Sequence, residues 1–172
     1  LVKWGANNWD VDYGNVSSIA SDGYALSIYT IAASRGWITR QQAYERVIRM
    51  LNTFETMQTV HGFWWHEVIT STGARNGTIE ISTVDSALFI LGALQAGEYF
   101  RSDHPDVAAK ADLLYRRMDW TWFLTGGDWF GNTFVNMGWQ PEMLNEYTLP
   151  SGRPEGGYFA TGWWSGYSES VF

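Results

Sequence analysis

The stretch at 62–100, GFWWHEVITSTGARNGTIEISTVDSALFILGALQAGEYF, decides how this chain folds. It opens with an aromatic extended segment, continues through a polar turn and ends in an apolar run. Apolar residues lie on every side of that run, so we expect a helix over 83–99 that other elements enclose. Glu80 and Asp85 stand at its start, where burial raises the pKa of a carboxyl and backbone donors lower it. One short segment therefore holds two carboxyls that could differ in protonation, as acid–base chemistry requires.

Two helices are predicted before this stretch. The first spans 19–35, ends at Gly36, and repeats apolar residues at helical spacing: Tyr24, Ile28, Ile31 and Ala32. The second starts at a capping box formed by Thr39 and Gln42. Its apolar stripe consists of Ala43, Val47, Met50, Phe54 and Met57. Because only a short turn separates the two helices, we expect an antiparallel hairpin.

The chain changes character after one more helix. Pro105 opens a helix predicted over 105–122, and the segments that follow are rich in Gly and Trp, which favours loops and short strands. A Gly/Pro turn cluster occupies 152–157, and a further apolar helix is expected to begin near 160 and to run to Phe172 without a cap. An uncapped apolar helix predicts partner helices beyond it.

The fold class expected from these elements is all-α. Amphipathic helices alternate with apolar ones, which indicates an α/α toroid whose inner helices are shielded on both sides. Four helices and the start of a fifth make only part of such a ring. We therefore expect 1–172 to be a single partial barrel domain that lacks its C-terminal helices. The missing C-terminal half is then one expected partner of this chain.

The composition excludes several classes of function. A net charge of −7 with no basic run is unsuited to nucleic acid or to an anionic membrane. The chain has no cysteine, which rules out disulfides and thiolate chemistry, and its apolar run is too short to span a bilayer. Aromatic residues reach 17%, with 11 Trp. Indole rings stack well on sugars, and the alternative is a large aromatic core.

Several stretches resemble the glucoamylase-like domain family, whose members include endo-β-1,2-glucanases and the cyclising domain of cyclic β-1,2-glucan synthases. They occur in the family's order and cover nearly the whole chain: SSIASDGY at 17–24, SRGWI at 34–38, HGFWWH at 61–66, EISTVDSAL at 80–88, AGEYF at 96–100, MGWQPE at 137–142 and WWSGYSE at 163–169. Together they are specific for the family, but not for one substrate within it.

The resemblance implies an (α/α)6 barrel with a sugar cleft at one end, of which this chain supplies the N-terminal half. It also implies hydrolysis or transfer of β-glucosidic bonds, most simply of β-1,2-glucan. Glu80 matches the position of a catalytic glutamate, and Glu169 matches a second acidic position near the cleft. One departure from the family pattern is Glu67, which follows His66 where relatives commonly have an aromatic residue. Some relatives take their second catalytic carboxylate from the C-terminal half.

Glu80 and Glu169 are the candidate catalytic residues. Glu80 would act as the general acid, with its pKa raised by neighbouring rings and by the exclusion of water. The alternative for Glu80 is a carboxylate stabilised by the helix dipole. Glu169 would act as nucleophile or base, because glycoside cleavage uses paired carboxyls. The alternative for Glu169 is a satisfied carboxylate on an inner helix.

Four polar residues are candidate substrate ligands, each with a structural alternative. Asp85 binds a sugar hydroxyl or tunes Glu80, unless it only completes a capping arrangement. His66 hydrogen-bonds a sugar or Glu80, unless it is simply packed in the core. Asp22 lies in the cleft or caps a helix. Glu142 binds from a loop or stabilises the first turn of a helix.

Stacking on sugar rings is predicted for some of five indoles: Trp64, Trp65, Trp129, Trp139 and Trp163. About half of them are expected to be packing, because large aromatic side chains are usually mostly buried. No metal and no cofactor is predicted, because His66 has no obvious second ligand. We expect a periplasmic or secreted location.

The leading hypothesis is therefore a glycoside hydrolase that acts on β-glucan, most simply β-1,2-glucan, with an oligo- or polysaccharide as its partner. A transglycosylase on the same glucan is the first alternative. A sugar-binding module without chemistry is the second, and glucan binding without new reducing ends would favour it. A third is a scaffold fragment that needs its other half to fold.

Overall fold

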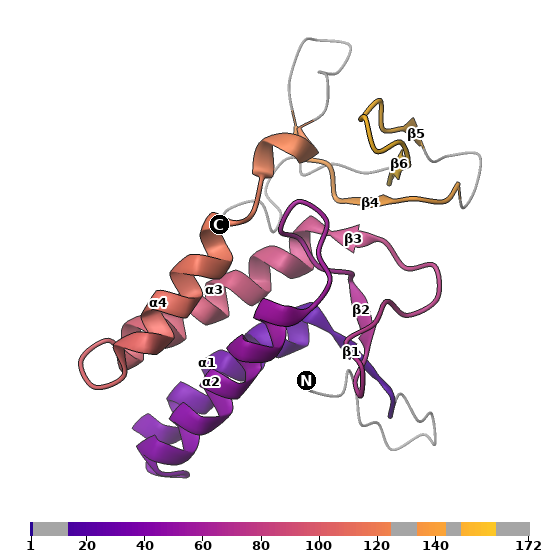
Figure 1. The fold of residues 1–172 in the computed structure, drawn as a ribbon. Coiled ribbons are helices and arrows are strands. Elements are labelled where there is room, and N and C mark those ends of the chain that lie inside the picture. The colour runs from indigo at the N-terminus through magenta and orange to yellow at the C-terminus, as the bar shows by residue number, and fades with distance from the viewer. Residues whose placement is uncertain (2–13, 125–133, 144–148, 161–172) are drawn as a thin grey trace.

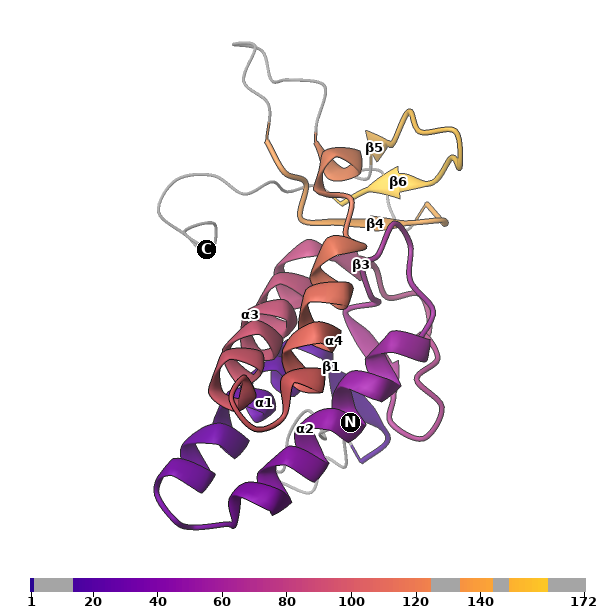
Figure 2. The same cartoon turned by 60° about the vertical axis from the view of Figure 1, so that its left-hand side comes forward.

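The computed structural model describes residue 1 and residues 14–124, 134–143 and 149–160. Within these residues the chain forms four α-helices, with two small antiparallel sheets gathered at one end of them (Figures 1 and 2). The helices are α1 Ile19–Ser34, α2 Arg40–Thr56, α3 Thr83–Phe100 and α4 Pro105–Arg116, followed by the 3-10 helix η1 Trp120–Phe123. The strands are β1 Val16–Ser18, β2 Glu67–Ile69, β3 Ile81–Ser82, β4 Gly138–Gln140, β5 Leu149–Pro150 and β6 Tyr158–Phe159. The described part is mostly helical, and the sheets are an addition to the expected all-α class.

The first three helices begin where the sequence predicts. Thr39 and Gln42 form the expected capping box of α2: the Gln42 N–H donates to the Thr39 hydroxyl at 3.1 Å, and the Thr39 N–H donates to the Gln42 side chain at 2.9 Å. At the start of α3 the Asp85 N–H donates to the hydroxyl of Ser82 at 3.1 Å. These two local signals fix the starts of α2 and α3.

The fourth helix is shorter than expected. α4 ends at Arg116 instead of continuing through Trp122. Asp119 accepts hydrogen bonds from the backbone N–H groups of Thr121 and Trp122 and thereby caps η1 as a separate element. The local bonding of an Asp side chain to backbone donors favours a new start over a continuing helix.

Helices α1 and α3 pack closely side by side. A β-carbon built on Gly92 of α3 would lie 2.1 Å from the carbonyl oxygen of Gly23 in α1, and one built on Gly23 would lie 2.5 Å from the carbonyl oxygen of Leu88. Only glycine permits two helix backbones to approach this closely. Since α1 follows β1 and α3 follows β3 directly, both helices begin at the end of the molecule that carries the sheets.

Helices α2 and α4 cover the other side of this pair with their apolar stripes. Phe54 of α2 stacks on Phe89 of α3, with ring centroids 3.7 Å apart and an interplanar angle of 12°. Of the predicted stripe of α2, Ala43, Val47, Met50 and Phe54 are buried, whereas Met57 is only partly buried. The buried residues of α4 are Val107, Ala111 and Leu114. Amphipathic outer helices thus lie against apolar inner ones.

One face of the inner helices is open in the described structure. Tyr24, Ile28 and Ile31 follow one another at helical spacing on α1 and are 58%, 57% and 50% exposed. Leu91 and Leu94 of α3 are also exposed. The expectation that the helix over 83–99 is enclosed on every side was therefore wrong for the described part. Periodicity detects an apolar face, but it does not say whether the same chain covers that face.

The sheets join segments that lie far apart in the sequence. β1 pairs with β2 through Ser17 opposite Val68, and β3 pairs with β4 through Ile81 opposite Trp139. β6 then pairs with both β4 and β5, giving the order β3-β4-β6-β5. The Gly/Pro cluster predicted at 152–157 forms the turn of the β5–β6 hairpin. Among the helices that the structure describes, none has the length and hydropathy needed to cross a lipid bilayer.

Candidate active site

The N-terminal ends of α1 and α3 meet around the backbone of His66. The His66 N–H donates to the carbonyl of Glu80 at 2.8 Å, and the His66 carbonyl accepts from the N–H of Ile19, the first residue of α1, at 3.1 Å. Trp65 and Ile81 form an isolated antiparallel bridge beside these bonds. The backbone therefore sets the histidine between the two helix starts, where the positive ends of the helix dipoles favour carboxylates.

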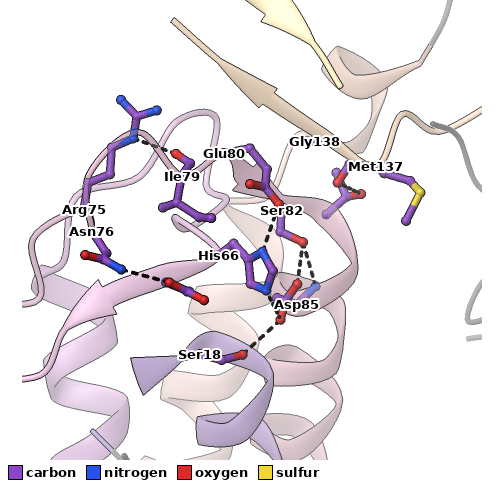
Figure 3. A network of polar contacts seen from close by, with 12 residues as sticks. Ser18, His66, Arg75, Asn76, Ile79, Glu80, Ser82, Asp85, Met137 and Gly138 are labelled. Atoms are coloured by element: carbon purple, nitrogen blue, oxygen red, sulfur yellow. Dashed lines mark hydrogen bonds and ion pairs between the residues drawn. The ribbon is translucent and has the colours of Figure 1, made fainter. Parts of the chain in front are cut away.

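The side chain of His66 lies between two carboxylates (Figure 3). Its Nδ1 is 2.9 Å from Oε1 of Glu80, and its Nε2 is 3.6 Å from Oδ1 of Asp85. The side chains of His66 and Glu80 are 32% and 28% exposed, and that of Asp85 is 13% exposed. We call Glu80, His66 and Asp85 the acidic–histidine cluster. It is half-buried, so its charges interact strongly while part of its surface remains open to solvent.

The carboxylate of Asp85 accepts hydrogen bonds from two hydroxyl groups in addition to its contact with the imidazole. Its Oδ2 accepts from the hydroxyl of Ser82 at 2.6 Å, and its Oδ1 accepts from the hydroxyl of Ser18 at 3.2 Å. Its backbone N–H donates to Ser82 at 3.1 Å, which confirms the predicted capping arrangement. The capping function and the contact with His66 therefore coexist in this residue.

The two partners of the shorter contact shift each other's pKa in opposite directions. Burial is the largest influence on Glu80 and raises the pKa, but the hydrogen bond to His66, a backbone hydrogen bond and the charges of His66 and Arg75 outweigh it. The pKa of Glu80 consequently lies below its ordinary value of 4.5. For His66 the hydrogen bond to Glu80 is the largest influence, and the nearby charges of Asp85, Glu80 and Glu67 add to it. They outweigh burial and raise the pKa above 6.5.

The expected raised pKa of Glu80 was therefore wrong. The sequence shows Ile79 and Ile81 beside Glu80, which suggests a desolvated acid. The imidazole that favours the ionised form lies 14 residues earlier in the chain, and only the bridge between 65 and 81 brings it close. The hydrogen bond from His66 to Glu80, which the sequence left open as one of two alternatives, is present.

Gly138 forms one wall of the position that Glu80 occupies. A β-carbon at Gly138 would lie 2.8 Å from Cγ of Glu80 and 2.6 Å from the carbonyl oxygen of Ile81. The β3–β4 pairing places Gly138 opposite Ser82. A residue without a side chain is therefore required where β4 passes the carboxylate.

Glu142 is paired with an arginine. Nη1 and Nη2 of Arg75 lie 2.7 Å and 2.9 Å from the two carboxylate oxygens of Glu142. The hydrogen bonds from Arg75 are the largest influence on the pKa of Glu142 and lower it. The alternative, in which Glu142 stabilises the first turn of a following helix, depends on residues outside the described part of the chain and stays a prediction.

Asp22 lies inside α1 and is fully buried. The hydroxyl of Ser17 donates to its Oδ2 at 2.9 Å. Because α1 begins at Ile19, with Ser18 as its N-cap residue, the cap alternative for Asp22 was wrong. Its carboxylate stands in the first turn of α1, where the helix dipole stabilises it.

The three described indoles that were candidates for stacking are buried against protein groups. Trp64 is enclosed by Phe54 and Phe89 and donates its Nε1–H to the carbonyl of Phe54 at 3.2 Å. The guanidinium of Arg75 covers Trp65 at 4.2 Å, and the ring of Trp139 lies against Gly157. For Trp64, Trp65 and Trp139 the packing alternative is therefore the one that the structure shows.

Several predicted residues fall outside the described part of the chain. Glu169, Trp163 and Trp129 are among them, and so is the helix expected after 160. Among the residues that are described, no group of three or more His, Asp or Glu side chains is arranged to hold a metal ion. A shallow hollow of about 450 Å³ lies between α3 and α4, lined by Leu94, Gly97, Arg101, Pro105, Ala108 and Asp112, and does not include the acidic–histidine cluster.

Three residues that shape the site were missed by the sequence analysis. Ser18 bonds Asp85, Gly138 gives space to Glu80, and Arg75 pairs with Glu142. Each acts on a partner distant in the sequence, so no local pattern identifies it. Position 18 adjoins a predicted helix start and position 138 lies in a Gly–Trp segment, but Arg75 stands in a polar turn without any distinguishing signal.

The chain is similar in sequence and in fold to proteins that act on β-1,2-glucans. An exo-β-1,2-glucooligosaccharide sophorohydrolase (non-reducing end) of Parabacteroides distasonis is 21% identical over 134 residues, which cover 72% of this chain and 18% of that protein. The endo-β-1,2-glucanase of Chitinophaga pinensis, solved with sophorotriose and glucose, superposes with a TM-score of 0.65 at 23% identity over 80% of this chain. A glucoamylase-like protein of Bacteroides uniformis superposes with a TM-score of 0.64 at 24% identity over 74% of this chain.

These similarities define the class of fold. The described helices and small sheets cover part of the toroidal structures of glucanases and glucoamylase-like proteins. The chain spans about a third of the Chitinophaga glucanase, 33%, and a smaller share of the sophorohydrolase, 18%. No protein-family model matches the chain. The chain is thus distantly similar to β-1,2-glucan hydrolases and shares the glucoamylase-like fold.

Proposed function

We propose that this chain is part of a glycoside hydrolase that cleaves β-1,2-glucan. The observation that carries the proposal is the half-buried hydrogen bond between Glu80 and His66, at 2.9 Å, within a chain that shares its fold with an endo-β-1,2-glucanase. Perturbed carboxyl and imidazole groups that partner one another at the open end of a scaffold are typical of sites of acid–base chemistry. A glycosidic bond is cleaved by a pair of such carboxyls.

Glu80 is proposed as the carboxyl that works in its ionised form. Its lowered pKa suits a base that activates water or a nucleophile that attacks the anomeric carbon, and does not suit a proton donor. The proton donor is then a second carboxyl. We propose Glu169 for it, in place of the role of nucleophile or base that the sequence pattern suggested for that residue. His66 fixes the orientation of Glu80 and favours its charge, and Asp85 holds the far side of the imidazole.

The test is an assay, on linear glucans of different linkage, of the hydrolase of which we propose that this chain is part. We expect new reducing ends from β-1,2-glucan and none from β-1,3- or β-1,4-glucan under the same conditions. Titration calorimetry with β-1,2-glucan accompanies the assay. Binding without cleavage would make the chain a sugar-binding module, and neither binding nor cleavage would overturn the proposal. A product that is a longer or cyclic glucan, without a rise in reducing ends, would favour transfer over hydrolysis.

We propose in addition that the open apolar face of α1 and α3 packs against further helical hairpins of a toroid of the (α/α)6 kind. Tyr24, Ile28 and Ile31 of α1, with Leu91 and Leu94 of α3, form this face. Contiguous apolar side chains on a helix usually meet a partner. Support for helical hairpins as that partner comes from the third of the glucanase that the chain spans, 33%.

The open face can be tested with the chain as it is. We expect the chain to be monomeric by light scattering and to bind an apolar fluorescent dye, and the double variant Ile28→Ser with Ile31→Ser to bind less dye at unchanged helix content. A dimer that this double variant dissociates would assign the face to a second copy. A monomer that binds no dye would show that the remaining residues of the chain cover the face, and would overturn the proposal.

A further inference from the structure

We propose that Arg75 is a positioning residue that holds Glu80 and His66 in hydrogen-bonding register. Its significance for catalysis rests on the function proposed above, whereas its effect on the geometry of the cluster does not. Arg75 touches no member of the acidic–histidine cluster through a hydrogen bond. It contacts instead the residues that precede two of them in the sequence.

Three contacts of the guanidinium carry this inference. Nε donates to the carbonyl of Ile79, the residue before Glu80, at 2.6 Å. The guanidinium carbon lies 4.2 Å from the ring centroid of Trp65, the residue before His66. Nη1 and Nη2 donate to the two carboxylate oxygens of Glu142 at 2.7 Å and 2.9 Å. One planar group therefore contacts the backbone next to Glu80 and the indole ring next to His66, and Figure 3 shows Arg75 turned toward Ile79 beside the cluster.

The ion pair with Glu142 ties this brace to β4. Glu142 lies just after β4, which pairs with β3 and places Gly138 against the side chain of Glu80. The side chain of Arg75 is 15% exposed, whereas that of Glu142 is 47% exposed. Arg75 is thus the buried partner of the ion pair and also contacts Ile79 and Trp65, whereas Glu142 lies at the surface. Removal of the arginine abolishes its contacts with Ile79, Trp65 and Glu142 at once. We expect this to affect the geometry more than the loss of a single surface ion pair would.

The chemistry requires arginine in particular. A guanidinium can donate in a bidentate manner to a carboxylate, use Nε for a carbonyl and stack on an indole face at the same time. An ammonium keeps the charge but has neither the fork nor the flat face. The exchange of Arg75 for lysine therefore separates positioning from charge.

The titration of His66 reports the geometry without any substrate. The charged groups that face its ring are Glu80 before β3, Asp85 on α3 and Glu67 on β2. If Arg75 acted only through its charge, its removal would take a cation away from the cluster and raise the pKa of His66. If Arg75 positions Glu80, its removal weakens the hydrogen bond that raises the pKa, and the pKa falls. The two mechanisms predict opposite signs.

The experiment is an NMR titration of the imidazoles in the wild-type chain, Arg75→Gln and Arg75→Lys, with His66→Asn to assign the signal. We expect the midpoint of His66 to fall by about half a pH unit or more in both variants. Arg101→Gln and Arg101→Lys are the matched controls, because Arg101 forms an exposed ion pair with Glu98, and they should leave the midpoint unchanged. A rise in Arg75→Gln, or no change in Arg75→Lys, would overturn the proposal. If Arg75→Gln fails to fold by circular dichroism, Arg75→Lys decides.

Kinetics on β-1,2-glucan separate this inference from the proposed function. We expect Arg75→Lys to lower kcat with little change in KM, because Arg75 orients a reacting group and is not proposed to bind sugar. A wild-type chain that does not cleave the glucan, together with a lowered His66 midpoint in Arg75→Lys, would refute the function and keep the positioning role. Cleavage together with an unshifted midpoint would refute the positioning role and keep the function.

Discussion

Gly23 of α1 and Gly92 of α3 face each other through their backbones: a β-carbon on Gly92 would lie 2.1 Å from the carbonyl oxygen of Gly23. This approach brings the starts of the two inner helices to the same place. Asp85 stands in the first turn of α3, and the first N–H of α1 bonds the carbonyl of His66. The geometry of the candidate site therefore depends on two residues without side chains.

Replacement of Gly92 by alanine tests this dependence. The added methyl group would press on backbone atoms, which cannot move aside as a flexible side chain can, so we expect the free energy of unfolding to fall by about 3 kcal/mol. Glu98→Ala, at an exposed position of the same helix, should change it by less than about 0.5 kcal/mol. Urea denaturation followed by circular dichroism measures both. Equal stability of Gly92→Ala and the wild type would show that α1 and α3 do not pack as described.

The Glu80–His66 pair should stabilise the fold within a limited range of pH. The pKa of His66 is raised in the folded chain, so its contribution is complete below 6.5 and is lost as the pH rises through the folded pKa. The pKa of Glu80 is lowered, so its contribution is complete above 4.5 and is lost as the pH falls through the folded pKa. The mutual stabilisation is therefore greatest between pH 4.5 and 6.5.

A double-mutant cycle with Glu80→Gln and His66→Asn measures this coupling. The four proteins are unfolded with urea at a series of pH values, and the coupling free energy is expected to peak in that range and to decline on both sides. A coupling that keeps growing above neutral pH would mean that a neutral imidazole, and not an imidazolium, contacts the carboxylate.

Arg117 is expected to stabilise the end of α2. Its Nη1 donates to the carbonyl of Glu55 at 3.2 Å, its Nη2 donates to the carbonyl of Phe54 at 2.9 Å, and its guanidinium lies over Trp64. These carbonyls belong to the last turn of the helix, where no following turn supplies N–H donors, and the carbonyl of Phe54 also accepts from Nε1 of Trp64. Arg117→Met keeps much of the apolar stem and removes the donors, so we expect a loss of about 2 kcal/mol in unfolding free energy.

The neighbouring arginine provides the control for that prediction. Arg116 is exposed and pairs with Asp112 one turn away. Arg116→Met should therefore alter the stability by less than about 0.5 kcal/mol. Chemical denaturation compares the two variants, and an equal loss in both would refute the capping role of Arg117.

The sequence could predict those features of the fold, such as helix starts, that depend on residues close together in the chain. The capping box of Thr39 and Gln42 and the cap formed by Ser82 each depend on donors and acceptors within one helical turn. The early end of α4 could also have been predicted from neighbouring residues. Asp119 is a typical capping residue, and it caps the separate helix η1 that begins at Trp120. The hydrophobic periodicity alone predicted that α4 continues beyond its actual end at Arg116.

What the sequence could not predict depends on contacts between distant residues. The ionised state of Glu80 follows from an imidazole brought close by a bridge between two extended segments. Arg75 and Glu142 are 67 residues apart. The burial of Trp139 likewise follows from the β5–β6 turn, where its Nε1–H donates to the carbonyl of Gly156. The aromatic composition suggested exposed indole faces. Composition contains no information about pairings between distant segments, so it could not show that these rings are covered.

The central claim, that the ionised carboxyl of Glu80 takes part in cleaving β-1,2-glucan, is tested most directly by the rate of reducing-end release from that glucan. Glu80→Gln keeps the size of the side chain and removes its charge, and Glu98→Gln makes the same change at the distant end of α3. We predict a loss of at least about a hundredfold in Glu80→Gln, as expected for a group in the reacting pair, and a wild-type rate in Glu98→Gln. A wild-type rate in Glu80→Gln would contradict the claim.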